Sequence, residues 1–407
     1  MDRARAPIRA GGAWALASVA VVLIVGLVRT IISARYLAPA EIGLVGIALL
    51  ALGFIEAVAS TGIDSALVAT RDDVDAYMDP AFTVQVVRGL LVFGLLCAAA
   101  PGIAWMFGAE GATAVIRSVA VIALLRGLAN PAVALAIRQL DFRRVFWWGL
   151  PELLCSLGLT IVLVIVRGDV WALVIALLAA QVVATIASYG LVPRRPMFTL
   201  ARERIQQLLK FGRFVSASRA LMYCSVNLDA AVVGVGMGTH SLGLYQFAAR
   251  VAELPVTTFT RAAAQVALPA LSGLRESPAV LLRTFRTMLA GVFAVNCAAA
   301  MFVIFLGEMA VEAVAGPRWL AAVPVLKILA IAMPFRAVVV LTGQLLDAIG
   351  QPAATMQLNA VRLVSLLVLL PSLGEWGGAQ GVAQGVLLAN AGAALFSLRL
   401  STRMVPL

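Results

Sequence analysis

Apolar segments of about 20 or more residues recur along the whole chain and are separated by short polar connections. Each segment is long enough to cross a hydrocarbon core of roughly 30 Å as an α-helix, which satisfies its own backbone hydrogen bonds in lipid. The pattern therefore predicts an all-α polytopic membrane protein of about twelve transmembrane helices. We expect spans at about residues 12–34, 42–69, 80–108, 113–137, 146–166, 169–192, 211–235, 242–270, 281–306, 319–345, 352–371 and 377–398.

Composition and charge agree with this pattern. The 407 residues are 62% hydrophobic and 13% charged, whereas a soluble domain is about half apolar and about a quarter charged. The net charge is +11, but the basic residues lie mainly in short connections between spans, so we expect no nucleic-acid partner. Alternate connections are the basic ones, and they include both chain ends. The positive-inside rule then predicts cytoplasmic termini at a bacterial inner membrane.

Two further features limit the chemistry. The first apolar stretch runs from about Gly12 to Ser33, which is too long for a cleaved signal peptide and predicts a retained first helix. The cysteines lie inside apolar segments and lack the CxxC spacing of a metal or redox site, so we expect buried thiols without disulfide, metal or cofactor. They are Cys97, Cys155, Cys224 and Cys297.

The longest connection divides the chain into two halves of six predicted helices. We expect an N-terminal lobe at residues 1–192, a cytoplasmic basic amphipathic linker at 193–210 that lies on the inner leaflet, and a C-terminal lobe at 211–407. The halves are weakly similar at an offset of 200 positions, where residues 36–48 align with residues 236–248 through a short turn that enters a helix at Gly-Leu. Such a repeat is parallel and predicts two pseudo-symmetric lobes around a central cavity.

Charged residues inside the predicted spans form stripes. An ionisable side chain near the bilayer centre costs roughly 3 kcal/mol, so each needs a wet cavity, a partner or an interface. Steps of about four residues place such side chains on one helix face. The stripes are Gln246, Arg250, Thr257, Arg261 and Gln265 with Glu253 in the eighth helix, Glu56, Ser60 and Asp64 in the second, Ser216, Arg219, Tyr223 and Asn227 with Asp229 in the seventh, and Arg29 with Ser33 in the first.

Two interpretations of these stripes stay open at this point: a water-filled cavity, or buried ion pairs that lock helices together. Other intramembrane charges carry less information. Arg88, Arg117, Lys327 and Arg336 lie within reach of an interface or near prolines, which favours snorkelling. Arg126 and Arg362 lie nearer mid-span and are interpreted as structural, and His240 as a loop residue.

If the stripes line a cavity, its arginines would suit an anionic headgroup such as a pyrophosphate. A guanidinium pairs bidentately with phosphate oxygens and keeps its charge when desolvated. The candidate binding residues are Arg29, Arg219, Arg250, Arg261 and Asn227. Carboxylates in the same stripes could bind a coupling proton or sodium ion, or release an arginine on protonation. They are Glu56, Asp64, Asp229 and Glu253.

Several stretches resemble the polysaccharide flippases of the multidrug/oligosaccharidyl-lipid/polysaccharide exporter superfamily. They are ISARYLAPAEIGL at 32–44, TGIDSALV at 61–68, NLD at 227–229, LGLYQFAAR at 242–250, ELP at 253–255, LPALS at 268–272, GPRW at 316–319 and AIGQ at 348–351. The resemblance implies two helical lobes that alternate between inward-open and outward-open states and carry an undecaprenyl-pyrophosphate-linked oligosaccharide. Many relatives have two more helices than the twelve expected here, which leaves the place of the lipid tail unassigned.

The resemblance also implies possible polysaccharide polymerase or assembly partners, and the two-lobe repeat favours a functional monomer. Two other functions compete with a flippase. A multidrug or cation antiporter of the same superfamily would share the lobes, but its cavity would be dominated by carboxylates and aromatic residues. A membrane enzyme of polysaccharide synthesis would be expected to show a large outer loop or a soluble catalytic domain, whereas the connections here are short. We therefore expect a transporter and not an enzyme.

Overall fold

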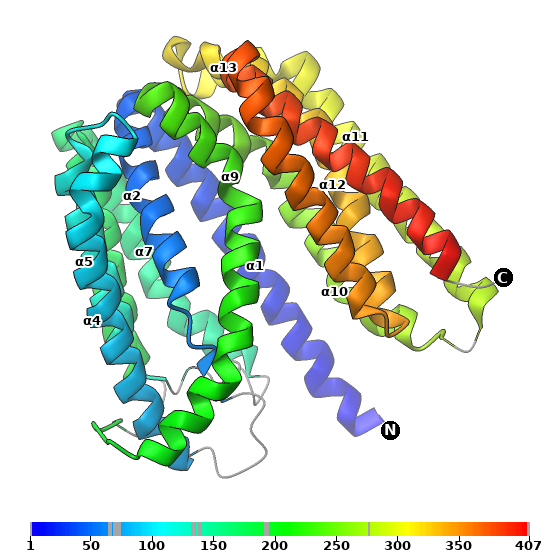
Figure 1. Cartoon of the computed structure of the whole chain (residues 1–407), viewed down its shortest axis with the longest axis horizontal. Helices are drawn as coiled ribbons and strands as arrows, with labels where there is room; N and C mark the ends of the chain where they lie inside the picture. Colours follow the sequence, from blue (N-terminus) through cyan, green and yellow to red (C-terminus); the bar gives the residue numbers. More distant parts are fainter. Residues whose placement is uncertain are drawn as a thin grey trace. The chain divides into compact units, whose positions relative to one another are not determined.

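The computed structural model describes residues 2–63, 67, 75–131, 133, 136, 141–190, 195–275 and 277–404, and in these residues it contains helices and no strands (Figure 1). The elements are α1 (Asp2–Tyr36), α2 (Pro39–Val58), α4 (Asp75–Met106), α5 (Ala112–Gly127), α7 (Phe142–Arg167), α8 (Val170–Ser188), α9 (Arg202–Pro255), the π-helix η1 (Val256–Thr260), α10 (Arg261–Ser272), α11 (Pro278–Val314), the 3-10 helix η2 (Pro317–Ala322), α12 (Val323–Ala348) and α13 (Pro352–Met404).

Eight helical stretches of the described residues are long and apolar enough to cross a membrane. Two of them contain a break: non-helical torsions at Gly238 divide α9, and those at Gly378 divide α13. The second part of α9 continues through η1 into α10. Counted this way, the described residues form twelve helical rods, and the prediction of an all-α membrane protein with about twelve helices is confirmed.

The chain divides into two compact units, residues 1–226 and 227–407. The division falls inside the first part of α9, after its contacts with α2. There the Tyr223 hydroxyl donates to the backbone carbonyls of Leu49 and Leu50, at 3.4 and 3.1 Å. A Cβ atom on Gly53 would lie 2.4 Å from the same hydroxyl. Glycine at this position of α2 therefore makes room for the Tyr223 ring.

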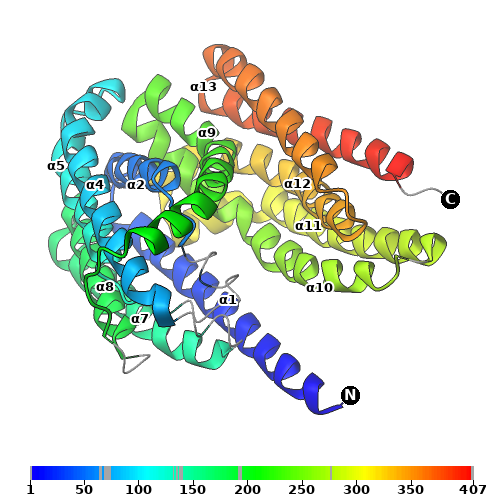
Figure 2. The ribbon, with the colours of Figure 1, turned by 60° about the horizontal axis from the view of Figure 1, so that its bottom comes forward.

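In unit 1, α5 packs against α4, α2 and α8, and α7 packs against α8 and α1 (Figure 2). The contact between α4 and α5 is made by backbone. A Cβ atom on Gly89 would lie 2.7 Å from the Ala123 carbonyl oxygen, and one on Gly127 would lie 2.9 Å from the Gln85 carbonyl oxygen. Small residues allow such close approach between membrane helices, whose association gains little from the hydrophobic effect.

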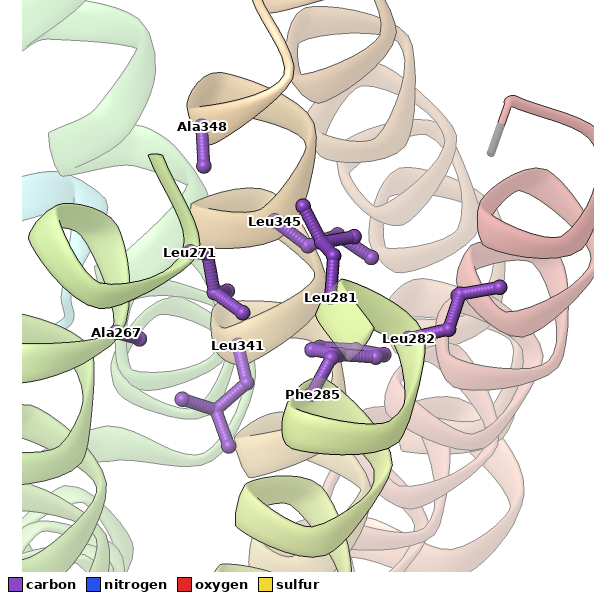
Figure 3. Close-up of a cluster of buried hydrophobic side chains, with 8 residues drawn as sticks. All are labelled: Ala267, Leu271, Leu281, Leu282, Phe285, Leu341, Leu345 and Ala348. Atoms are coloured by element: carbon purple, nitrogen blue, oxygen red, sulfur yellow. The ribbon is translucent and has the colours of Figure 1, made fainter. Parts of the chain in front are cut away.

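In unit 2, α12 is the central helix and packs against α10, α11 and α13. A cluster of buried side chains joins α10, the start of α11 and the end of α12 (Figure 3). Its members are Ala267, Leu271, Leu281, Leu282, Phe285, Leu341, Leu345 and Ala348. At the other end of α12, the fully buried Trp319 of η2 packs on Phe247 with ring centroids 4.7 Å apart. These contacts hold α12 at both ends.

Corresponding turns of the two halves support the predicted repeat. The turn between α1 and α2 at Ala38 corresponds to the break in α9 at Gly238, where φ is +77°. The turn between α4 and α5, which contains Gly108, corresponds to the turn between α11 and α12, which contains Gly316. The turn between α7 and α8 at Gly168 corresponds to the break in α13 at Gly378. All of these glycines have positive φ, which other residues rarely adopt. The three pairs lie about 200 to 210 positions apart.

The connection before α9 is attached to the beginning of α4. The Met197 backbone N–H donates to Asp79 Oδ1 at 3.0 Å, and the Thr199 N–H donates to Thr83 Oγ1 at 2.9 Å. The Phe198 ring packs on Phe82 at 5.2 Å between centroids. Residues 195–201 are not helical. The described part of the expected amphipathic linker is therefore a short segment fixed to α4, followed from Arg202 by helix.

Candidate functional site

An ion pair inside the spans joins α5 to α2 in unit 1. Arg126 Nη1 lies 2.5 Å from Glu56 Oε2, and Arg126 Nε donates to Gln181 Oε1 of α8 at 3.1 Å. Glu152 of α7 is half-buried within electrostatic range of Arg126. The Arg126 side chain is nevertheless 47% exposed. Four helices of unit 1 thus bring polar side chains to one place, which we call the unit 1 polar cluster (Glu56, Arg126, Glu152 and Gln181).

Sequence reasoning did not single out Glu152 or Gln181, although α7 carries a usable signal. Trp148, Glu152, Ser156 and Thr160 follow one another in steps of four residues, which places them on one helix face. Arg29 of α1 donates from Nη1 to Ser156 Oγ on this face, at 3.1 Å. The candidate residue Arg29 is therefore held by α7. The stripe of α7 was missed because most of its members are uncharged.

The predicted faces of the second and seventh helices meet, but with a different local structure. Arg219 of α9 donates from Nη1 to Ser60 Oγ at 2.9 Å. Helix α2 ends at Val58, and residues 60–62 are not helical, with Gly62 at a φ of +60°. The expectation that the helix runs to residue 69 and carries Glu56, Ser60 and Asp64 on one face is therefore wrong where the chain is described. Asp64 lies outside the described residues.

In unit 2 the candidate carboxylates have partners on neighbouring elements. Glu253 forms an ion pair with Arg336 of α12. Asp229 accepts hydrogen bonds from the Tyr245 hydroxyl at 2.8 Å and from the Ala230 backbone N–H at 2.9 Å. Glu253 also lies in electrostatic range of Arg250, three residues earlier, as the sequence suggested. Arg336 does not snorkel to an interface as predicted, because its guanidinium points to a carboxylate.

Arg362 completes the charged set of unit 2. Its Nε donates to Asn390 Oδ1 at 3.0 Å, within α13, and it lies in electrostatic range of Asp229, Glu253 and Arg336. Asn227, two residues before Asp229, is half-buried. Arg362 therefore belongs to the same network as the candidate carboxylates.

The stripe of the eighth helix is interrupted by the π-helix η1. Pro255 lacks a backbone N–H, so the regular hydrogen-bond ladder cannot continue through it, and the five residues Val256–Thr260 wind more loosely. A π-turn accommodates one extra residue, which rotates all later side chains by about 100° around the axis. Arg250 and Arg261 therefore do not share the single face that a continuous α-helix would give. Both remain exposed. The structure does not describe the side chains of Thr257 and Gln265.

The Glu56–Arg126 and Glu253–Arg336 ion pairs occupy corresponding positions. In unit 1 the glutamate comes from the second rod and the arginine from the fourth, Glu56 with Arg126. In unit 2 the glutamate again comes from the second rod, the second part of α9, and the arginine from the fourth, α12. An ion pair repeated in this way is unlike a random surface pair and is a further observation in favour of two related halves.

The fold and the charged residues inside it define the class: a multi-pass membrane protein of two helical units. Its fold is that of solved transporters. An inward-facing multidrug transporter of the MATE family matches with a TM-score of 0.74 at 18% identity, covering 95% of this chain and 94% of that one. The lipid II flippase MurJ in an inward closed conformation matches with a TM-score of 0.79 at 18% identity, covering 94% and 86%.

Sequence comparison then gives the family. Residues 32–324 match the family model described as "Polysaccharide biosynthesis protein", and the chain belongs to this family. It is 24% identical over 300 residues to the teichuronic acid biosynthesis protein TuaB of Bacillus subtilis, with 73% of this chain and 62% of that protein covered. It is 25% identical over 307 residues to the succinoglycan biosynthesis transport protein ExoT of Rhizobium meliloti, with 74% and 61% covered.

A third relative is matched over more of its length. The lipopolysaccharide biosynthesis protein WzxC of Escherichia coli is 20% identical over 386 residues, with 93% of this chain and 78% of that protein covered. By contrast, the chain spans about three fifths of the length of TuaB and ExoT. The expected resemblance to the polysaccharide branch of the superfamily is confirmed.

Proposed function

We propose that the protein translocates an undecaprenyl-pyrophosphate-linked oligosaccharide, or a related polysaccharide precursor, across the bacterial inner membrane by alternating access. Membership of the polysaccharide biosynthesis family supports a role in making surface polysaccharide. The relative ExoT is named a succinoglycan biosynthesis transport protein, and the chain shares its fold with a lipid II flippase. In this proposal the protein is a transporter without catalytic activity, has cytoplasmic termini and works as a monomer beside polymerase or assembly proteins.

The observation that carries the proposal is the state of Arg250 and Arg261. Both side chains are exposed on membrane-spanning helix, and no described residue forms a hydrogen bond or a close ion pair with either guanidinium. A guanidinium without a tight partner can offer paired N–H donors to the oxygens of a pyrophosphate. Arg29 and Arg219 already donate to Ser156 and Ser60, so we assign them a secondary role along the path.

The carboxylates supply the coupling in this proposal. Protonation of Glu253 would remove its attraction for Arg336, and a change at Asp229 would alter its hydrogen bond with Tyr245. The first change would weaken the contact of α12 with the second part of α9, and the second would weaken the contact between the two parts of α9. A proton is therefore the coupling ion that these contacts favour, and sodium is the alternative that the same carboxylates could bind.

The proposal is tested in a strain that lacks this protein. We expect undecaprenyl-linked oligosaccharide to accumulate in the cytoplasmic leaflet while surface polysaccharide disappears, and the intact chain to reverse both. Arg250→Ala and Arg261→Ala should each reduce export at least tenfold with the protein still inserted. Arg250→Lys should keep part of the activity as a point charge without the fork geometry. Arg283→Ala, an exposed arginine in the first turns of α11, is the matched control.

Full export by both alanine variants would contradict the assignment of the two arginines. Normal surface polysaccharide in the deletion strain, together with altered resistance to cationic drugs, would instead indicate a multidrug antiporter. The exposed guanidinium groups of Arg250 and Arg261 argue against that second function, because a site for cations would be expected to present carboxylates in their place.

A further inference from the structure

We infer that unit 1 contains a binding subsite for an uncharged, hydroxyl-rich group, the sugar part of the transported molecule, formed by the unit 1 polar cluster and the adjacent face of α7. This inference rests on the proposed function and extends it by separating recognition of the sugar from recognition of the pyrophosphate. It assigns Glu152 and Gln181 to the sugar, while Arg250 and Arg261 bind the anion.

The first argument is unused hydrogen-bonding capacity. Arg126 has five N–H donors, and its contacts with Glu56 and Gln181 leave several of them free. The Gln181 amide accepts from Arg126 through oxygen, so its two N–H donors remain available. No described residue donates to the Glu152 carboxylate. Donors and acceptors that are held in place and lack protein partners are what a ligand with many hydroxyls requires.

The second argument comes from the same face of α7. Trp148 lies four residues before Glu152, so the two side chains are neighbours on the helix surface. The Trp148 indole N–H is buried, and no described residue accepts its hydrogen bond. A buried donor without an acceptor is costly, and tryptophan N–H groups normally find a partner. A sugar hydroxyl can supply one, and the aromatic ring offers an apolar surface for the C–H face of the sugar.

The charge of the cluster argues for a neutral ligand. With Arg29 held at Ser156 on the adjacent face of α7, two guanidinium groups balance the carboxylates of Glu56 and Glu152, so the subsite offers no excess positive charge to attract a pyrophosphate. A cation is disfavoured because Arg126 already occupies the space beside Glu56 at 2.5 Å and lies in range of Glu152. Planar carboxylate, amide and guanidinium groups side by side can instead pair with neighbouring hydroxyls of a sugar ring.

The test uses the purified full chain in lipid nanodiscs with two probes. One is undecaprenyl pyrophosphate, and the other is undecaprenyl-pyrophosphate-linked oligosaccharide extracted from the deletion strain. Dissociation constants are measured for both. We expect Glu152→Ala and Gln181→Ala to weaken binding of the sugar-bearing probe about tenfold and to leave the sugar-free probe unchanged. Glu152→Gln keeps the shape and an acceptor and should lose less. Arg250→Ala should weaken both probes.

The control variant is Glu110→Ala, an exposed glutamate in the turn between α4 and α5, which should bind both probes like the wild type. Equal weakening of both probes by Glu152→Ala, or no change in either, would overturn the subsite while leaving the proposed function intact. Binding of tetraphenylphosphonium that competes with the sugar-bearing probe and is lost in Glu152→Ala would overturn it in favour of a cation site. If the wild-type chain binds neither undecaprenyl probe, the proposed function fails and the subsite fails with it.

Discussion

The Glu56–Arg126 pair of unit 1 and the Glu253–Arg336 pair of unit 2 occupy corresponding rods but lie in different surroundings. In unit 1 the arginine side chain is 47% exposed and the glutamate 19% exposed. In unit 2 the arginine is 22% exposed and the glutamate 36% exposed. The unit 1 arginine lies beside Glu152, to which no described residue donates a hydrogen bond, whereas the unit 2 arginine lies in a network with Asp229 and Arg362.

This difference indicates that two corresponding contacts take different roles. A pair with an exposed guanidinium and unused neighbours can bind a ligand. A pair with a more buried guanidinium, balanced by further charges, holds helices together and responds as a unit to a change in protonation. The comparison predicts larger stability effects in unit 2 and larger ligand effects in unit 1.

The largest expected effect follows from breaking the unit 2 pair. Arg336→Met leaves Glu253 without its ion-pair partner and near the like charge of Asp229. Because the pair is only partly buried, we expect a cost of about 2–3 kcal/mol, below the roughly 3–5 kcal/mol of a fully buried pair. Arg126→Met, the matched change in unit 1, should cost about 1–2 kcal/mol, because its guanidinium is half exposed. Thermal unfolding of both variants in detergent measures the difference. Adding Glu253→Gln to Arg336→Met should restore part of the loss. Equal costs in the two units would contradict the assigned roles.

A smaller effect is expected from substitutions of glycines that lie at contacts between helices. A methyl group on Gly127 would lie 2.9 Å from the Gln85 carbonyl oxygen and 3.2 Å from the Gly89 Cα atom. Backbone atoms cannot turn aside, so Gly127→Ala should cost about 1–3 kcal/mol through overpacking of α4 and α5. Gly307 of α11 is the matched site in unit 2, where the added atom would meet only side chains, at 3.4 and 3.9 Å. Gly307→Ala should be close to neutral by the same unfolding measurement.

The smallest effect concerns the turn between α7 and α8 in unit 1, which contains a charged Arg–Asp pair. Arg167 donates from Nε and Nη2 to Asp169, at 3.2 and 3.0 Å, and these bonds together with the cap bond from the Ala172 N–H lower the pKa of Asp169. A pKa lowered by folding adds stability at pH values above the unfolded pKa of about 3.9, and this stability is lost as pH falls through the lower folded pKa. The matching turn at Gly378 has no acidic residue.

We therefore expect Asp169→Ala to lower stability by about 1 kcal/mol at pH 7, the usual value of an N-cap, and by less at pH 3, below the unfolded pKa of about 3.9. Melting temperatures at the two pH values measure this. Asp169→Asn keeps a capping oxygen but loses the charge, so it should lose less stability than the alanine variant at pH 7 and lie closer to the wild type at pH 3. A deficit of Asp169→Ala that is the same at pH 3 as at pH 7 would show that the charge of Asp169 does not contribute.

Many residues of the candidate site could be predicted from the sequence, but the contacts between them could not. Arg250 and Glu253 are three residues apart, and a helix-surface pair was the reasonable expectation. The structure adds Arg336, 83 positions away, as an ion-pair partner of Glu253, because α12 packs against the helix that follows and brings a guanidinium toward that face. Arg250 and Arg261 were correctly placed in a span. Their helix face was not, because the prediction assumed a continuous α-helix and did not include the extra residue that η1 accommodates after Pro255.

The sequence by itself determined the number of rods, because lipid requires about 20 apolar residues for each crossing and leaves little choice of backbone structure. It also determined the corresponding turns at Ala38 and Gly238, since a turn needs residues that tolerate its torsions. Only the tertiary structure decided which charge meets which. A charge inside a membrane pairs with whatever a neighbouring helix presents at the same depth, and helix packing, which sets depth and rotation, depends on contacts between residues far apart in the chain.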